Sequence, residues 1–278
     1  MSWTAIARKD FQDASRSKAL WALTALFVLF MAGMAYVFTL VGDAGAGELD
    51  TVRLLSFLIG PVTLLIPLTA LVMAHKAVAS EVESGSAKFL LSLPHTRRDT
   101  VVGKVVGRSA VMGVAVLVGL VVAAIVVLGL YDAFDAMAYL GFSVLSLLLA
   151  AVFTAIGVGL SAMTKDTGRA TILAAGFYIV FEVIWGVVSM GIHYLLNGSF
   201  FPMGTPPDWY LLLNRIPPSS AFTTAVYRLL PGDYGVMASY FPDSAPFFLS
   251  EWAALVILLA WLVAVPAIGY WRFQAADL

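Results

Sequence analysis

The sequence predicts an all-α integral membrane protein with six transmembrane helices, and three observations carry that prediction. First, 61% of the 278 residues are hydrophobic and only 12% are charged, whereas a soluble domain carries about 25% charged residues. Second, six apolar runs are long enough to cross roughly 30 Å of hydrocarbon, which takes about 20 helical residues. Third, basic residues gather in alternate connections between those runs, as expected of a multi-pass protein.

The predicted spans are apolar runs separated by connections that contain charged or turn-forming residues. They are residues 19–41, 54–74, 109–130, 137–163, 170–195 and 252–271. The fourth and fifth are longer than a membrane requires, so we expect them to tilt or to protrude at one end. Pro61 and Pro67 interrupt the backbone hydrogen bonds of the second span, either as a static kink, which we favour, or as a hinge.

The orientation follows from the lysines and arginines, because basic residues next to spans stay in the cytoplasm. A cytoplasmic N-terminus puts every lysine and arginine except Arg53, Arg215 and Arg228 on that side. Both termini are therefore expected in the cytoplasm of a cell-membrane protein. Charges spread over residues 1–18, ahead of the first apolar run, do not match a removable signal peptide.

The first non-spanning element is an N-terminal helix within residues 1–18. Trp3, Ile6 and Phe11 recur at helical spacing together with Ala7 and Ala14, and charged residues lie opposite them. This amphipathic pattern predicts a helix that lies in the headgroup layer of the cytoplasmic leaflet.

The second is the charged stretch 81–104, EVESGSAKFLLSLPHTRRDTVVGK. Gly85 provides a turn, residues 86–93 can form about two helical turns, and Pro94 ends them. Thr96 and Asp99 have the spacing of a capping box, so a new helix should begin there and run unbroken into the third span. The apolar face of the short helix is formed by Phe89, Leu90 and Leu93, and its charged neighbours are Glu81, Glu83, Lys88, Arg97, Arg98 and Lys104. A simple charged loop has no reason to present such an apolar face, so we predict a docking surface.

The third is the proline-rich and aromatic outer segment 196–250. Ser219 or Ser220 is expected to cap a short helix from Ala221 to Leu230, which Pro231 and Gly232 end. Ten residues cover about 15 Å, so this helix can enter the outer leaflet but cannot cross the membrane.

Motifs for catalysis or cofactor binding are missing from the sequence. There is no cysteine, no paired-histidine zinc motif, no Walker phosphate loop and no nucleophile elbow. The net charge of -1 gives no indication of a nucleic-acid partner. We therefore expect a chain that is not an enzyme by itself, with no catalytic residue, cofactor or metal of its own.

One carboxylate, Glu182, falls in the middle of the fifth predicted span. A charge at that depth costs about 2.5 to 3.5 kcal/mol on insertion scales, so Glu182 should face the bundle interior. It can line a substrate pathway or a dimer seam, or it can be a neutral residue bonded to a Ser, Thr or Tyr of a neighbouring span.

The stretch 81–104 resembles the signature between the second and third spans of ABC-2 type permeases. The matching residues are Glu81, Glu83, Gly85, Ser86, Leu90, Leu91, Ser92, Pro94, Thr96, Arg97, Val101, Gly103 and Lys104. The departures are Lys88 and His95, neither of which disturbs the turn, helix and cap. The plan of the whole chain is similar to the six-span subgroup that includes the nitrous-oxide-reductase maturation permease.

This resemblance implies a single ABC-2 transmembrane domain over residues 1–278, the permease subunit of an ATP-driven exporter. Two such subunits, identical or paralogous, would pair in the bilayer, and each would dock a separate cytoplasmic ATPase that holds ATP and Mg²⁺. Residues 86–93 would be the coupling helix.

Two other functional classes remain open. A mechanotransmission or scaffold subunit would use the same motion on an outer maturation partner without moving a solute, and the outer segment is compatible with that role. An intramembrane hydrolase would need Glu182 to meet a serine, a histidine or a second carboxylate in space.

Overall fold

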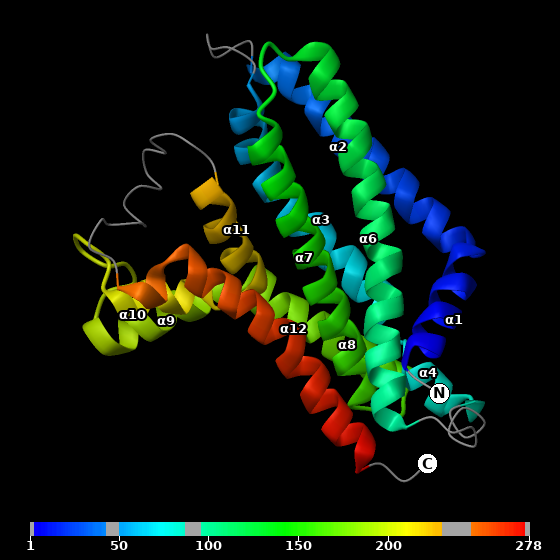
Figure 1. Cartoon of the computed structure of the whole chain (residues 1–278). Coiled ribbons are helices and arrows are strands. Elements are labelled where there is room, and N and C mark those ends of the chain that lie inside the picture. Colours follow the sequence, from blue (N-terminus) through cyan, green and yellow to red (C-terminus); the bar gives the residue numbers. More distant parts are fainter. Residues whose placement is uncertain (1–2, 43–49, 87–95, 230–245, 276–278) are drawn as a thin grey trace.

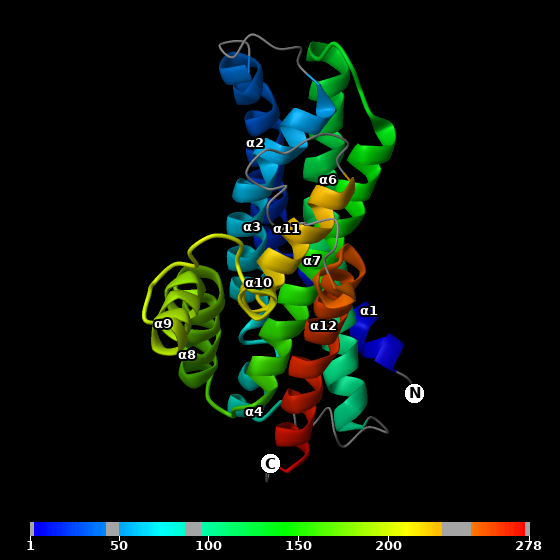
Figure 2. The ribbon, with the colours of Figure 1, turned by 90° about the vertical axis from the view of Figure 1, so that its left-hand side faces the viewer.

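The computed structural model describes residues 3–42, 50–86, 96–229 and 246–275, and within them the chain is almost entirely helical. Long helices form one bundle (Figures 1 and 2), and the described residues form no β-sheet, only an isolated bridge between Asp50 and Ala133. The helices are α1 (Trp3–Ser15), α2 (Lys18–Gly42), α3 (Thr51–Ala74), α4 (Ala79–Glu83), α6 (Arg97–Leu130), α7 (Ala136–Ala162), α8 (Thr167–Tyr178), α9 (Trp185–Asn197), α10 (Asp208–Arg215), α11 (Pro218–Leu229) and α12 (Glu251–Gln274).

Helix α7 is the centre of the bundle and packs against α3, α6, α11 and α12. Its side chains Phe142, Leu149 and Phe153 are fully buried. Glycines let neighbouring helices approach closely: a Cβ on Gly269 of α12 would overlap the backbone of Gly159 on α7. Such small-residue contacts are typical of membrane bundles, where dispersion rather than hydrophobic burial holds helices together.

Five of the predicted spans correspond to single helical segments. These are α2, α3 with α4, α6, α7 and α12, each long and apolar enough to cross a membrane. The predicted capping box is confirmed: the Thr96 hydroxyl accepts a hydrogen bond from the backbone of Asp99, and the Asp99 carboxylate accepts one from the backbone of Thr96. Because the helix starts at this cap, α6 runs unbroken from Arg97 to Leu130 and is longer than its spanning part.

The fifth predicted span, 170–195, is wrong as a single straight helix. Helix α8 passes into a π-helical turn (Ile179–Val183), and α9 then leaves at an angle of 61°. Tertiary contacts hold the chain at this break: the Trp185 indole donates a hydrogen bond to the carbonyl of Leu213 at 2.8 Å, and the Phe181 ring lies 5.0 Å from the Trp261 ring. The described residues thus hold five helices that are long and apolar enough to cross a membrane, or six if the bent pair crosses it as one.

The described part of the segment between α9 and α12 holds two α-helices, instead of the single one expected, and a 3-10 turn at Phe247–Leu249. Helix α10 was not predicted. Helix α11 begins at Pro218, so Ser219 and Ser220 lie in its first turn and do not cap it, contrary to prediction. The Phe222 and Val226 side chains are fully buried, and α11 packs against α7 and α12. The predicted stop at Pro231 and Gly232 lies outside the described residues.

Candidate functional site

The start of α1, the short helix α4 and the last turn of α12 lie at one end of the bundle, which we call the basal end (Figure 1). Four charged side chains meet there: Asp10 of α1, Glu81 of α4, and Lys104 and Arg108 of α6. The Lys104 ammonium lies 2.7 Å from a Glu81 carboxylate oxygen and 3.5 Å from one of Asp10, and the Arg108 guanidinium lies 3.0 Å from the other Asp10 oxygen. The side chains of Lys104 and Asp10 are each only 7% exposed. Two acids and two bases balance, so the cluster, which we call the basal ion cluster, is neutral as a unit.

Two glycines of α6 allow α1 to pack closely against α6. A Cβ on Gly103 would lie 2.7 Å from the Ile6 Cβ, and one on Gly107 would lie 2.9 Å from the Ala7 carbonyl oxygen. Ile6 and Ala7 are accordingly buried, while Trp3 is 40% exposed and Phe11 is partly buried against the core. The packed face of α1 therefore points at α6, and its position in the headgroup layer stays a prediction.

The link between α3 and α4 is held by Ser161 of α7. Its hydroxyl oxygen accepts hydrogen bonds from the backbone N–H groups of Val78 and Ala79, each at 3.0 Å, and all three residues are buried. Arg108 adds a bond to the carbonyl of Met73 at 3.3 Å. Both contacts provide hydrogen-bond partners for backbone groups at the interruption between α3 and α4, and buried backbone N–H and C=O groups need such partners.

Glu83 reaches the start of α8. Its carboxylate accepts a hydrogen bond from the backbone N–H of Thr167 at 3.2 Å, where a negative charge also complements the helix dipole. Gly85 follows with a φ of 75°, the left-handed conformation that glycine adopts without strain, so the predicted turn is present.

On the other flank of the charged stretch, Arg97 binds the end of α12. Its guanidinium donates to the carbonyls of Phe273 and Gln274 and lies 5.5 Å from the centre of the Phe273 ring. A cation on the last carbonyls of a helix is favourable for the dipole as well as for hydrogen bonding. Arg98 is exposed and lines a groove between α6 and α12.

The other predicted docking residues lie outside the described residues. They are Lys88, Phe89, Leu90, Leu93 and Pro94. What the structure describes is the attachment of both flanks: Glu81 and Glu83 bind α6 and α8, and Arg97 binds α12.

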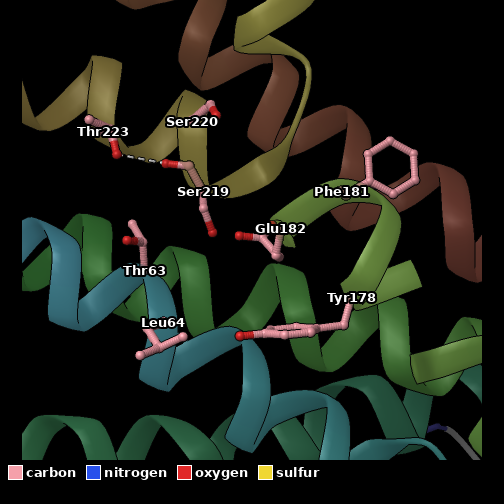
Figure 3. Close-up of a pocket in the computed structure, with 8 residues that line it drawn as sticks. All are labelled: Thr63, Leu64, Tyr178, Phe181, Glu182, Ser219, Ser220 and Thr223. Atoms are coloured by element: carbon pink, nitrogen blue, oxygen red, sulfur yellow. Dashed lines mark hydrogen bonds between the residues drawn. The ribbon is translucent and has the colours of Figure 1, made fainter. Parts of the chain in front are cut away.

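Glu182 lies away from the basal ion cluster, in the π-helical turn after α8. Its carboxylate and the Ser219 hydroxyl point toward one another across a hollow of about 280 Å³ (Figure 3). Thr63 and Tyr178 also line this hollow, and the Thr223 hydroxyl donates to the Ser219 carbonyl at 2.9 Å. No histidine or second carboxylate is among the described lining residues, so the hollow can form hydrogen bonds but offers a hydrolase no catalytic constellation.

Sequence reasoning missed Asp10, Arg108 and Ser161. A signal for Asp10 was available, because it lies on the same helical face as Ile6 and Ala7, and a charged residue on a packing face needs a buried partner. Gly103 and Gly107, four residues apart on α6, indicated where that face would pack. Ser161 carried no local signal, since its partners lie 82 and 83 residues away.

The comparisons with known proteins agree with this architecture. The family described as ABC-2 family transporter protein matches residues 4–278. The chain is 31% identical over 288 residues to the probable ABC transporter permease protein NosY of Pseudomonas aeruginosa, covering 98% of this chain and 97% of the relative. It is 32% identical over 232 residues to the protein of the same name from Stutzerimonas stutzeri, covering 81% of this chain and 79% of the relative.

Proposed function

The chain belongs to the ABC-2 family of transporter proteins, and from that premise we propose that it is the permease subunit of an ATP-driven exporter whose ATPase docks at the basal end. As a family member it is a multi-pass protein of the cell membrane, and its role is that of a membrane subunit that is not itself catalytic. The direction of transport, the docking site and the pairing with a second permease subunit belong to the proposal.

The observation that carries the proposal is the attachment of the stretch 81–104 at both flanks. On the first flank, the Glu81 carboxylate binds Lys104 of α6, which also lies near Asp10 of α1, and Glu83 binds the start of α8. Arg97 joins the other flank to α12. A force applied to residues 87–95 would therefore be passed to several helices at once, because the first flank is bound to α6 and α8 and the second flank to α12.

The basal end also has the charge expected of a cytoplasmic surface. Lys76 follows α3, Lys165 follows α7 and Arg272 lies in the last turn of α12. Basic residues next to spans are retained in the cytoplasm, where a soluble ATPase with ATP and Mg²⁺ would meet residues 87–95. Phe89, Leu90 and Leu93 supply the apolar contact in this proposal.

The test is copurification of the ATPase with the tagged permease. We expect Phe89→Asp or Leu93→Asp to abolish copurification while membrane insertion is unchanged, because a buried carboxylate would oppose docking. Gln12→Asp, which adds the same charge at an exposed position of α1, is the control and should retain the ATPase. Copurification of either variant at the wild-type level would reject the docking site.

A second candidate is mechanotransmission to an outer partner. It is favoured by exposed apolar side chains beside α10 and α12: Phe200 is 57% exposed, Phe201 62%, Met203 94% and Phe247 72%. Large exposed apolar groups are a feature of protein interfaces. Capture of an extracytoplasmic protein that is lost on Phe200→Ser and Phe201→Ser would favour this candidate, whereas a gene neighbourhood holding only an ATPase and permease pair would favour export.

A further inference from the structure

A basic pocket lies at the basal end between the α7–α8 connection and the last turn of α12, and we propose that it binds the headgroup of an anionic phospholipid. The pocket has a volume of about 280 Å³ and is lined by Lys165, Asp166, Arg169, Arg272 and Phe273 among others. The pocket shares no residue with the basal ion cluster, so the proposal goes beyond ATPase coupling.

The charges in the pocket favour an anion. Three of its lining side chains are cationic and one is acidic. The acid, Asp166, caps α8: its carboxylate accepts a hydrogen bond from the backbone N–H of Arg169 at 2.7 Å. The two arginines offer a phosphate several charge-assisted hydrogen bonds, because guanidinium groups bind phosphate with two parallel donors, and Lys165 adds positive charge to the cavity.

The level of the pocket favours a lipid over a free anion. Helix α7 ends at Ala162, α8 begins at Thr167, and Arg272 is in the last turn of α12, so the pocket lies where apolar helices end. Basic pockets between spanning helices on the cytoplasmic side are the type of site that binds anionic headgroups.

Apolar side chains lead away from this pocket along both helices. Ile172 on α8 is 72% exposed, and Ile268 and Trp271 on α12 are 51% and 65% exposed. Arg272 lies 5.8 Å from the centre of the Trp271 ring, and tryptophan is enriched at the membrane interface. A phospholipid can use the cationic pocket and these apolar surfaces together, whereas a free phosphate can use only the first.

The test is the thermal unfolding temperature of the detergent-purified full chain with short-chain lipids. We expect dihexanoylphosphatidylglycerol to raise the temperature, because a ligand of the folded state stabilises it, and dihexanoylphosphatidylcholine to have little effect. Arg169→Gln with Arg272→Gln should raise the midpoint concentration about 30-fold, given the contribution of each cation near a membrane surface. Arg169→Lys with Arg272→Lys should largely retain binding, which controls for folding.

The control removes two exposed cations elsewhere, Arg16→Gln with Lys18→Gln, and should leave the midpoint unchanged. An equal effect of both lipids, or an unchanged midpoint in the double glutamine variant, would overturn the proposal. So would stabilisation by inorganic phosphate alone at the same concentration, which would indicate a free-anion site. If the Arg169→Gln, Arg272→Gln variant loses ATPase copurification but keeps its response to the anionic lipid, the pocket binds a protein partner and the lipid proposal is rejected.

Discussion

Asp10→Asn tests whether the basal ion cluster holds α1 on the bundle. The substitution keeps the size of the side chain and removes its charge, so the cluster changes from neutral to a net charge of +1. Arg108 loses an oxygen at 3.0 Å, and Lys104 retains Glu81 at 2.7 Å. Asp10 is only 7% exposed and Arg108 is 29% exposed, so water can replace the lost interaction only in part.

The size of the effect follows from that burial. Removing one partner of a buried ion pair costs about 3 to 5 kcal/mol, and we expect the lower end, about 3 kcal/mol, because Glu81 still neutralises Lys104. For a chain of this size about 1 kcal/mol changes the unfolding temperature by roughly 2 °C. We therefore expect unfolding of the detergent-purified protein to begin about 6 °C lower.

The matched control is Asp13→Asn on the same helix, one turn further along and exposed. Its expected cost is within about 0.5 kcal/mol, as for surface substitutions in general. Adding Lys104→Met to Asp10→Asn should recover part of the loss, because it removes the excess charge. The ion cluster does not hold α1 if Asp10→Asn lowers the stability no more than Asp13→Asn does. The same conclusion follows if the stability loss of the double variant equals the sum of the losses of Asp10→Asn and Lys104→Met measured singly.

Two further substitutions test the packing around the cluster. Ser161→Ala leaves the buried N–H groups of Val78 and Ala79 without an acceptor, which should cost about 1 to 3 kcal/mol of stability for each. The control is Ser143→Ala on the same helix, which should cost under about 0.5 kcal/mol because the Ser143 hydroxyl donates only to the carbonyl of Tyr139 in its own helix. Equal unfolding temperatures of the two variants would contradict the role of Ser161 in holding the link between α3 and α4. Gly107→Ala should displace α1 and so expose a cysteine introduced at position 7 to maleimide, which labels only that cysteine because the chain has no other. The control is Gly113→Ala, whose Cβ would come no closer than 3.9 Å to a neighbour and which should leave the introduced cysteine protected. Protection of the cysteine in both variants would reject the close contact between α1 and Gly107.

The parts of the fold that local sequence determines could be predicted. Five spanning segments follow from hydropathy alone, and the start of α6 at Thr96 follows from a capping box contained within four residues. The turn at Gly85 likewise needed only the residue itself. In each case the interaction that fixes the element lies within one helical turn or one apolar run, so no knowledge of the bundle is required.

The parts that distant contacts determine could not be predicted. The fifth predicted span bends where Trp185 donates to Leu213, 28 residues away, and where Phe181 also meets Trp261 at 5.0 Å. Apart from Glu182, the polar residues of the sequence 170–195 are Thr171, Ser189 and His193, which lie away from the bend, and the segment contains no proline that would indicate a break. The basal ion cluster joins residues up to 98 positions apart in the sequence, Asp10 and Arg108. Its charges could be found in the sequence, but their pairing could not.

The attachments at the basal end indicate how a displacement there would divide within the bundle. Through Arg97 it reaches α12, which is packed backbone to backbone on α7 at Gly159 and therefore moves with the core. Through Glu83 it reaches α8, which has only Ala170 and Ala174 buried and ends in the π-helical turn.

A helix with so little of its surface packed against the core can shift relative to it at lower cost than α12 can. Helix α8 has 12 residues, so it is a rod of about 18 Å. One end of this rod is bound by Glu83 and the other carries Glu182 into the hollow with Ser219. We therefore expect movement at the basal end to change the hollow around Glu182 before it changes the packing of α7, because α8 is held more weakly than α12.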